Sequence, residues 1–325
     1  MKIAHLVSSK IFAGIEQHVY ELSSFMSDVS DQIIICDEEI HHHMDGIKTT
    51  ALNIGSRYSP LNTFQLIKFL NKNNVPMLHC HGAKASTIGR GVKICSSIKV
   101  VSTIHGHKKN NSAFTNVDAV ISVNKLLSKN IPNSTYIPNW FNPAHAGERS
   151  SRSGPIIAIG RLEKVKGFDQ LIKSWININE CLEIIGPGPE EAMLNQLIQD
   201  LNLQDRIQII TNFDYHSIES KYKTASGLIV SSLREGGPRV VLEAINHEIP
   251  VLGSRVGIIP DLIPNECLSE PDNQESLQIL LEEMIPLLPQ LNMEGIKAAL
   301  IENYSVANSA KKTKEIYDAL LTASS

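Results

Sequence analysis

The stretch GLIVSSLREGGPRVVLEAI, residues 227–245, joins an apolar strand, a glycine turn and the start of a helix. Residues 227–231 form an apolar run typical of a buried strand, and from Val240 the apolar side chains follow helical spacing. Gly236 and Gly237 make the turn between them. A buried strand that leads directly into a helix predicts a parallel α/β sheet, and such sheets bind ligands at the carboxyl ends of their strands.

Two carboxylates flank this turn, Glu235 on the loop and Glu243 about one turn into the helix. We expect the backbone N–H groups of Gly236, Gly237 and Arg239 to point out of the helix start, where the partial positive charge suits a diphosphate. Glu243 is then placed to accept hydrogen bonds from ribose hydroxyls, and Glu235 from a sugar ring. The alternative is that Glu235 caps the helix and Glu243 is a solvated surface residue.

A second break between strand and helix, in residues 156–172, contains two cations, Arg161 and Lys166. Both follow the end of one apolar strand, so they can converge on one pyrophosphate. There they would stabilise the negative charge that grows as a nucleoside diphosphate leaves. Taken singly, either cation is more often a surface residue.

Taken together, these segments resemble the family 4 glycosyltransferases of the GT-B fold. The resemblance is carried by Gly160-Arg161 with Lys166-Gly167, by IIGPGP at residues 184–189, and by the segment from Glu235 to Glu243. Weaker matches extend it over nearly the whole chain, at AGIE (13–16), HCHG (79–82), TIHG (103–106) and IPN (137–139).

The resemblance implies an α/β protein with two Rossmann-like domains that face a central cleft. Residues 1–148 would bind the acceptor, residues 149–304 the nucleotide sugar, and residues 305–325 would form a helix crossing back to the N-terminal domain. Apolar runs that alternate with helical patterns predict the same two parallel sheets. Strands are predicted at residues 3–7, 33–36, 77–80, 100–104, 119–123, 156–159, 182–185, 207–210, 228–231 and 251–253. The linker is expected within residues 142–155.

The implied activity is the transfer of a sugar from a nucleotide diphosphate sugar, usually uridine-linked, to an acceptor hydroxyl. The anomeric configuration is retained, and no metal or other cofactor is required. Among the family's functional positions, Gly14 matches a loop glycine that approaches the phosphates, and His105 matches a histidine that meets the donor sugar. The predicted catalytic residues are His105, Arg161, Lys166 and Glu235. The predicted nucleotide-sugar site comprises Gly14, Arg161, Lys166, Glu235, Gly236, Gly237, Pro238, Arg239, Val240 and Glu243.

Several positions depart from the family's pattern, most visibly Ala13 and Trp140; another is the segment 256–261, where the family often shows Gly-Gly and a glutamate. Ala13 stands where a second glycine is common, which stiffens the loop before Gly14, and Trp140 stands where glycine usually follows the Ile-Pro-Asn segment.

The composition fits a globular protein and bears on its location. Hydrophobic residues make up 42% and charged residues 20%. Five cysteines, an odd and scattered set, suggest reduced thiols and a cytoplasmic protein. The first residues break off before any signal-peptide core forms, and no apolar run reaches the roughly 18 residues of a membrane span. Any membrane contact would therefore be peripheral, at the inner face of the cytoplasmic membrane.

Charge is unevenly distributed along the chain. Residues 60–149 contain eleven cations and two carboxylates, a balance of +9 that leaves −13 elsewhere for the net charge of −4. This region predicts contact with an anionic membrane surface or a phosphorylated glycan, unless it is an ordinary solvated surface. Nucleic acid is a weaker partner because aromatic residues, at 5%, do not alternate with the lysines.

Several alternatives stay open. The run His41-His42-His43 invites a metal hypothesis, but consecutive side chains diverge, so no metal site is predicted. His79 and His81 fit a role at the acceptor or a structural role equally well. The expected acceptor is a glycan or lipid-linked glycan of bacterial lipopolysaccharide, O-antigen or capsule, with a small soluble acceptor as the alternative. A nucleotide-sugar 2-epimerase and a non-catalytic partner that binds a sugar nucleotide are the rival functions.

Overall fold

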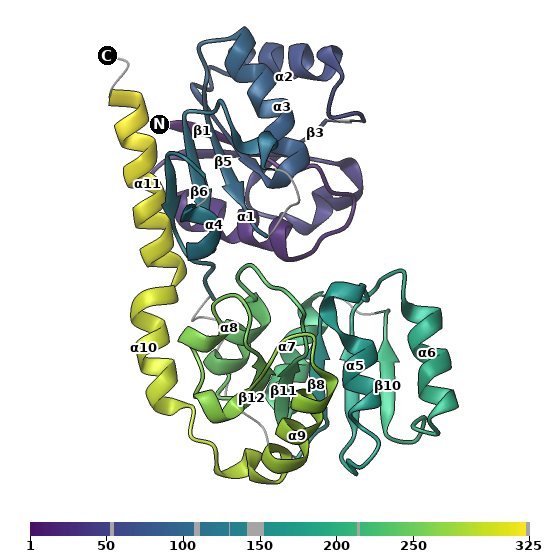
Figure 1. Cartoon of the computed structure of the whole chain (residues 1–325). Helices are drawn as coiled ribbons and strands as arrows, with labels where there is room; N and C mark the ends of the chain where they lie inside the picture. Colours follow the sequence, from purple (N-terminus) through teal and green to yellow (C-terminus); the bar gives the residue numbers. More distant parts are fainter. Residues whose placement is uncertain (53–54, 107–110, 130, 142–152, 213–214, 323–325) are drawn as a thin grey trace. The chain divides into compact units, whose positions relative to one another are not determined.

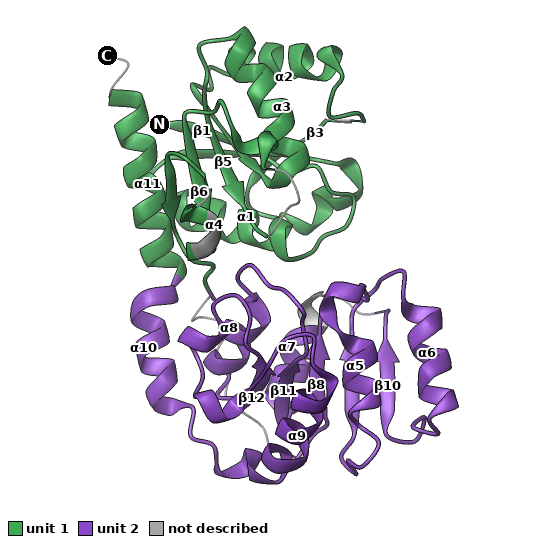
Figure 2. Ribbon diagram, viewed as in Figure 1, with its two compact units in different colours: residues 1–140, 306–325 green, residues 141–305 purple. Residues whose placement is uncertain are grey.

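The protein divides into two compact units (Figure 2). The computed structural model describes residues 1–52, 55–106, 111–129, 131–141, 153–212 and 215–322. The first unit combines Met1–Trp140 with Val306–Ser325, and the second is Phe141–Ser305. The boundary expected at 148/149 and most of the expected linker fall in residues 142–152, which lie outside the described residues.

The first unit is built on a parallel sheet, seven-stranded in the described residues, with the order β3-β2-β1-β4-β5-β6-β7 (Figure 1). The strands are β1 (Lys2–Leu6), β2 (Asp31–Cys36), β3 (Lys48–Ala51), β4 (Met77–His81), β5 (Lys99–Ile104), β6 (Ala119–Ser122) and β7 (Ser134–Tyr136). All five strands predicted in this half are confirmed. The outermost strands β3 and β7 were not predicted, because they are short and their side chains are mostly half-buried or exposed.

Helices cover both faces of this sheet. They are α1 (Gly14–Met26), α2 (Pro60–Lys72), α3 (Gly82–Cys95), α4 (Lys125–Lys129) and α11 (Val306–Thr322), with short 3₁₀ helices η1 (Glu38–His43) and η2 (Ser112–Phe114). On one face, α2 and α3 bury Leu66, Leu70 and Ile88 against the strands. On the other face, α1 and α11 pack over Ile3, and Tyr317 of α11 is completely buried there.

The second unit repeats the scheme with a parallel sheet that is six-stranded in the described residues, in the order β10-β9-β8-β11-β12-β13. Its strands are β8 (Ile156–Ile159), β9 (Leu182–Ile185), β10 (Ile207–Ile210), β11 (Gly227–Val230), β12 (Val251–Ser254) and β13 (Leu268–Ser269). The five predicted strands are again confirmed. Around them lie α5 (Phe168–Lys173), α6 (Glu191–Asp200), α7 (Tyr215–Thr224), α8 (Arg239–Asn246), α9 (Gln274–Met284) and α10 (Glu294–Tyr304), with 3₁₀ helices η4 (Lys164–Lys166), η5 (Ile259–Asp261), η6 (Asn265–Cys267) and η7 (Ile285–Gln290).

The strand order reverses once in each sheet, and these two points position the candidate site. In the first unit the reversal lies between β1 and β4, and in the second between β8 and β11. Ligands of open α/β sheets bind beyond the carboxyl ends of the strands at such a reversal. In the second unit, the segments that leave this position are those that begin with Gly160 and Ser231.

Candidate functional site

The loop containing Lys166 is fixed to the segment that follows β11. The Ser231 hydroxyl donates to the Lys166 carbonyl at 2.9 Å, and the Leu233 N–H donates to the Val165 carbonyl at 2.9 Å. Gly167 has a φ of +65°, and a Cβ there would lie 2.3 Å from the Ser231 carbonyl oxygen. Glycine is therefore required at position 167, both by its backbone angle and by the close approach of the two segments.

This contact brings the predicted cation and carboxylate together. Lys166 Nζ lies 2.6 Å from Glu235 Oε1, and the Ser232 hydroxyl donates to the same oxygen at 2.6 Å. The Lys166 side chain is 23% exposed and that of Glu235 11%, so the pair is largely withdrawn from water. Partial burial strengthens their attraction relative to a surface ion pair and fixes both groups at the sheet's reversal point.

Arg161 lies at the start of the same loop but in a more open setting. Its guanidinium is 3.2 Å from Glu163 Oε1, and its side chain is 57% exposed. Beside it, Gly160 leaves room for the Lys166 side chain, whose Cε lies 3.1 Å from where a Cβ of residue 160 would stand. The exposed Arg161 can thus change partner at little cost, because surface ion pairs are weak.

A third loop, which follows β9, supports this arrangement. Gly186 has a φ of +149°, and a Cβ there would lie 2.0 Å from the Gly160 carbonyl oxygen. The Leu162 N–H donates to the Pro187 carbonyl at 3.0 Å, and a Cβ at Gly188 would lie 2.5 Å from the Leu162 backbone. The glycines of the IIGPGP segment therefore allow backbone to pack directly on the backbone that presents Arg161.

The Glu243 carboxylate contacts two neighbouring side chains, Tyr222 and Arg239. Tyr222 donates from its hydroxyl to Glu243 Oε2 at 2.9 Å, and Arg239 Nε lies 3.5 Å from Oε1. The Glu243 side chain is 20% exposed, so it is not the solvated surface residue of the alternative reading. Nor does Glu235 cap the helix: α8 has Pro238 as its N-cap and no side-chain cap hydrogen bond.

The predicted residues of the first unit lie at the end of β1 and of β5. Gly14 begins α1, directly after the N-cap Ala13, and a Cβ at Gly14 would meet nothing within 4 Å. Two residues later, the Glu16 carboxylate accepts from the Ala13 N–H at 3.2 Å. Burial raises the pKa of Glu16 to about 7, although the hydrogen bonds from the backbone oppose the shift. Because a Cβ at Gly14 would meet no atom within 4 Å, the fold itself does not require a glycine at this position.

We predict that Gly14→Ala weakens binding of the sugar donor about 10- to 100-fold, the usual cost of one forced methyl contact, if the phosphates approach this backbone. Folding stability should be unchanged or slightly higher, because alanine is the better helix former. Gly295→Ala is the matched control, since Gly295 also lies in the first turn of a helix and also has open space. Equal donor dissociation constants for the two variants would remove Gly14 from the site.

His105, which is half-buried, is the last residue of a hydrogen-bonded chain of imidazoles whose other members, His5 and His81, are buried. His5 Nε2 is 2.8 Å from Gln32 Oε1, His5 Nδ1 is 3.1 Å from His81 Nε2, and His81 Nδ1 is 3.4 Å from His105 Nε2. The Gln32 amide orientation is set by Ser30. Gln32 Nε2 donates to the Ser30 hydroxyl at 2.6 Å, and that hydroxyl acts as an acceptor because it donates its own hydrogen to the Met26 carbonyl at 3.3 Å. Gln32 Oε1 is therefore an acceptor, which makes His5 Nε2 a donor.

With neutral rings, this one assignment orients every hydrogen bond in the chain. His5 Nδ1 accepts from His81 Nε2–H, and His81 Nδ1 accepts from His105 Nε2–H. Burial lowers the pKa of His5 to about 4 and the pKa of His81 well below 6.5, so both rings are neutral at physiological pH. A neutral His105 ring in this chain has Nε2 as its donor and Nδ1 as its acceptor.

His79 and Trp140 complete the surroundings of this chain. His79 is bonded on both nitrogens, by the Tyr317 hydroxyl and, at 2.7 Å, by the Thr103 hydroxyl, which supports the structural role for this residue. Trp140, which departs from the family's pattern, packs against His18 with ring centroids 3.9 Å apart and ring planes tilted by 33°. Its indole N–H donates to Glu21 Oε2 at 2.8 Å, so the bulky residue is accommodated with its polar atom satisfied.

The buried imidazoles predict a loss of stability in mild acid. Burial lowers the pKa values of His5, His79 and His81 in the folded state, whereas in the unfolded chain they return to about 6.5. The unfolded state therefore binds protons first. Stability is complete above pH 6.5 and falls as the pH drops toward about 4, by about 1.4 kcal/mol per pH unit for each histidine that stays neutral.

Urea unfolding between pH 7.5 and pH 5, as approximate limits, measures this slope. His5→Gln should reduce this slope by the contribution of one histidine, about 1.4 kcal/mol per pH unit. Thr103→Val removes a partner of His79 without removing an imidazole, so it should lower stability equally at every pH. A slope that His5→Gln leaves unchanged would contradict the prediction.

Metal-ligand geometry within the described residues is confined to the same histidines. Two groups have ligand atoms within 4.8 Å of one another: His5, His79 and His81, and His18, His81 and His105. Several of these nitrogens already take part in the hydrogen bonds described above. The run His41–His43 forms no such group in the described residues, and His41 Nε2 lies 2.6 Å from the Thr49 hydroxyl.

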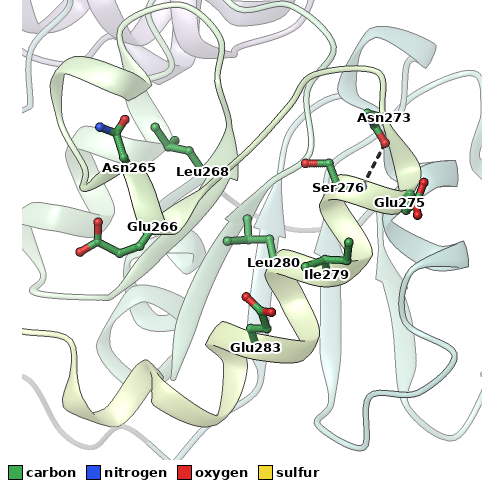
Figure 3. A pocket seen from close by; sticks show the side chains of 9 residues that line it. All are labelled: Asn265, Glu266, Leu268, Asn273, Glu275, Ser276, Ile279, Leu280 and Glu283. Carbon is green, nitrogen blue, oxygen red and sulfur yellow. Dashed lines mark hydrogen bonds between the residues drawn. The ribbon is translucent and has the colours of Figure 1, made fainter.

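A separate pocket lies in the second unit between η6, β13 and α9 (Figure 3). Three glutamates, Glu266, Glu275 and Glu283, line it, and the Ser276 N–H donates to the α9 N-cap Asn273 at 3.0 Å. Clustered carboxylates repel a diphosphate. The pocket also lies on the outermost strand rather than at the sheet's reversal point, so it is not the candidate site.

None of the helices in the described residues combines the length and the apolar character needed to span a membrane.

The chain is similar to known proteins along nearly its whole length. The model of a family described as "Glycosyl transferases group 1" matches residues 147–316. A protein of Arabidopsis thaliana, named as one of the subunits of phosphatidylinositol N-acetylglucosaminyltransferase, is 23% identical over 360 residues, which cover 96% of this chain and 80% of that protein.

Solved structures share its architecture. Sucrose-phosphate synthase from Thermosynechococcus elongatus superposes with a TM-score of 0.85 at 16% identity, covering 99% of both chains. The Anabaena protein HepE, solved with UDP and glucose, gives 0.82 at 15% identity and covers 98% of this chain and 100% of its own. At these identities the likeness concerns the fold, and it confirms the expected α/β GT-B class.

Proposed function

Because this chain belongs to the glycosyl transferases group 1, whose model matches more than half of it, and is a glycosyltransferase, we propose that it uses a uridine diphosphate sugar and retains the anomeric configuration. The proposed acceptor is a hydroxyl of a lipid-linked molecule. The observation that carries the proposal is the Lys166–Glu235 pair at the reversal of the second sheet, with Arg161 beside it.

Lys166 and Glu235 balance each other's charge across a distance of 2.6 Å. A donor diphosphate that takes up the Lys166 ammonium would release Glu235 to accept a hydrogen bond from the sugar. Arg161 can leave the exposed Glu163 for the same diphosphate. The charge of the departing diphosphate is then balanced by two cations, so the proposed reaction uses no obligatory metal or other cofactor.

Retention is explained by attack on the face from which the diphosphate leaves. The departing phosphate oxygen can accept the proton of the acceptor hydroxyl, so no dedicated base is needed. His105 would bind a hydroxyl of the donor sugar through Nδ1, in the tautomer that the imidazole chain fixes. Glu243, held by Tyr222 and Arg239, would bind the ribose.

Two acceptor types are supported to different degrees. The Arabidopsis relative is named for phosphatidylinositol and N-acetylglucosamine, which favours a phospholipid acceptor and an N-acetylglucosamine donor. The sequence-based expectation of a bacterial lipopolysaccharide, O-antigen or capsule acceptor is the second candidate. In both cases the acceptor is membrane-bound, and we place the protein in the cytoplasm, peripheral at the inner face of the cytoplasmic membrane.

The experiment is a thermal-shift panel of uridine, guanosine, adenosine and cytidine diphosphates and their common sugars. A ligand at a hundred times its dissociation constant adds about 2.7 kcal/mol to stability. We expect a shift with the uridine compounds that is lost in Glu243→Ala. No shift with any nucleotide would overturn the donor site.

Transfer assays then separate the remaining alternatives. Release of nucleoside diphosphate that depends on phosphatidylinositol or a lipid-linked glycan identifies the acceptor. Conversion of the donor without an acceptor would indicate an epimerase. Donor binding without release of nucleoside diphosphate would indicate a silent partner. Because the name of the Arabidopsis relative makes it one of several subunits, the assay would then be repeated with a partner chain.

A further inference from the structure

Four large apolar side chains project into solvent from one part of the first unit. They are the most exposed of their kind in the described residues: Tyr58 at 79%, Leu61 at 72%, Ile94 at 71% and Phe64 at 68%. No other large apolar side chain in the described residues exceeds 59%. Isolated exposed apolar residues are ordinary, but a group of them marks an interaction surface.

These side chains come from two helices that touch. Leu61 and Phe64 lie on α2, Tyr58 lies just before it, and Ile94 is on α3. The helices approach closely where Gly91 meets α2, because a Cβ there would lie 2.8 Å from the Thr63 hydroxyl oxygen. Figure 1 shows α2 beside α3, on the outside of the sheet in the first unit.

The stretch of sequence that carries these side chains is basic, although two of its lysines, Lys93 and Lys99, are paired with Asp118. Residues 46–117, which include both helices, contain ten lysines and arginines and no aspartate or glutamate. Lys68 and Lys72 are exposed on α2, and the Arg57 guanidinium lies 5.9 Å from the centre of the Tyr58 ring. We call this surface, formed by Tyr58, Leu61, Phe64, Ile94, Lys68 and Lys72, the α2–α3 face.

We propose that the α2–α3 face docks on an anionic lipid bilayer. Aromatic and aliphatic side chains insert at the boundary between headgroups and acyl chains, while lysines and arginines bind the anionic headgroups. A face with exposed cations and exposed apolar side chains matches a surface with a negatively charged headgroup layer over an apolar interior. The proposal rests on the peripheral location proposed above and assigns the surface that makes the contact. It does not depend on sugar transfer, because docking requires neither donor nor acceptor.

Vesicle sedimentation tests it directly. We expect the full chain to bind vesicles of phosphatidylcholine with about one third phosphatidylglycerol, and to bind pure phosphatidylcholine much more weakly. Leu61→Ser with Phe64→Ser should weaken binding by about tenfold or more for each side chain. Lys68→Gln with Lys72→Gln should weaken it about fivefold for each charge. The matched control is Val29→Ser with Ile279→Ser, two exposed apolar residues elsewhere, which should bind as the wild type does.

Native cysteines report which surface enters the bilayer. Cys95 is exposed beside Ile94, and Cys181 is exposed in the second unit. An environment-sensitive fluorophore on Cys95, in Cys181→Ser, should shift its emission to the blue on anionic vesicles. The same fluorophore attached to Cys181 in the Cys95→Ser variant should keep its emission unchanged on the same vesicles.

Each opposite result overturns the proposal. If the chain binds no vesicles, the α2–α3 face is left for a protein partner. If the Leu61/Phe64 variant binds as tightly as the Val29/Ile279 control, or if both fluorophores shift alike, the membrane contact lies elsewhere. Because these assays contain no donor, a failure of the proposed transfer activity leaves their result unaffected.

Discussion

Glu235→Gln is expected to lower the rate of sugar transfer, kcat, by at least about a hundredfold, the usual cost of losing one stabilising group at a reacting centre. The glutamine keeps the volume of the side chain but loses the charge that balances Lys166 at 2.6 Å. It also loses the carboxylate that is proposed to orient the donor sugar. Steady-state kinetics with the donor identified by thermal shift measure the effect.

Two other carboxylates provide the comparison. Glu243→Gln should mainly raise the donor KM, because its proposed partner is the ribose, which does not react. Glu163→Gln should change either constant little, because its ion pair with Arg161 is exposed. If Glu235→Gln and Glu243→Gln both retain wild-type kinetics, the assignment of this site is wrong.

Lys166→Ala should reduce kcat by about 10²- to 10³-fold, since the ammonium is proposed to stabilise the departing diphosphate. This variant should also lose stability, because it leaves the Glu235 carboxylate, 11% exposed, without its cation. Lys164→Ala is the matched control: Lys164 lies in the same 3₁₀ turn, and it is exposed. It should keep both activity and stability.

The double variant Lys166→Met with Glu235→Gln separates charge balance from catalysis. It removes both charges, so we expect stability close to that of the wild type while transfer stays as low as in the single variants. If transfer recovers together with stability, then the pair is structural, and the charge on the diphosphate is balanced elsewhere.

The central strands of both sheets could be predicted from sequence because they are buried on both faces and consist of apolar runs. Edge strands gave no such signal. β3 reads KTTA and β13 has two residues, and each is defined by its pairing with a neighbouring strand rather than by its own composition.

The arrangement of the candidate site could be predicted where its residues are close in sequence or follow strand ends. Lys166 and Glu235 follow β8 and β11, and adjacent parallel strands bring the residues after them to one edge. Tyr222 could not be connected to Glu243, because their contact is a single hydrogen bond between side chains of two different helices, α7 and α8. The imidazole chain was missed for a similar reason, since His5 and His81 meet only through the register of β1 and β4.

The division of the chain between the two units also constrains the order of events during synthesis. The second unit is continuous, from Phe141 to Ser305, so all the residues of its core are synthesised before α11. The first unit begins at Met1, yet its core includes Val306, Ala310 and the fully buried Tyr317. The half that is translated first is therefore completed last, and the nascent N-terminal sheet keeps an apolar face uncovered until α11 emerges.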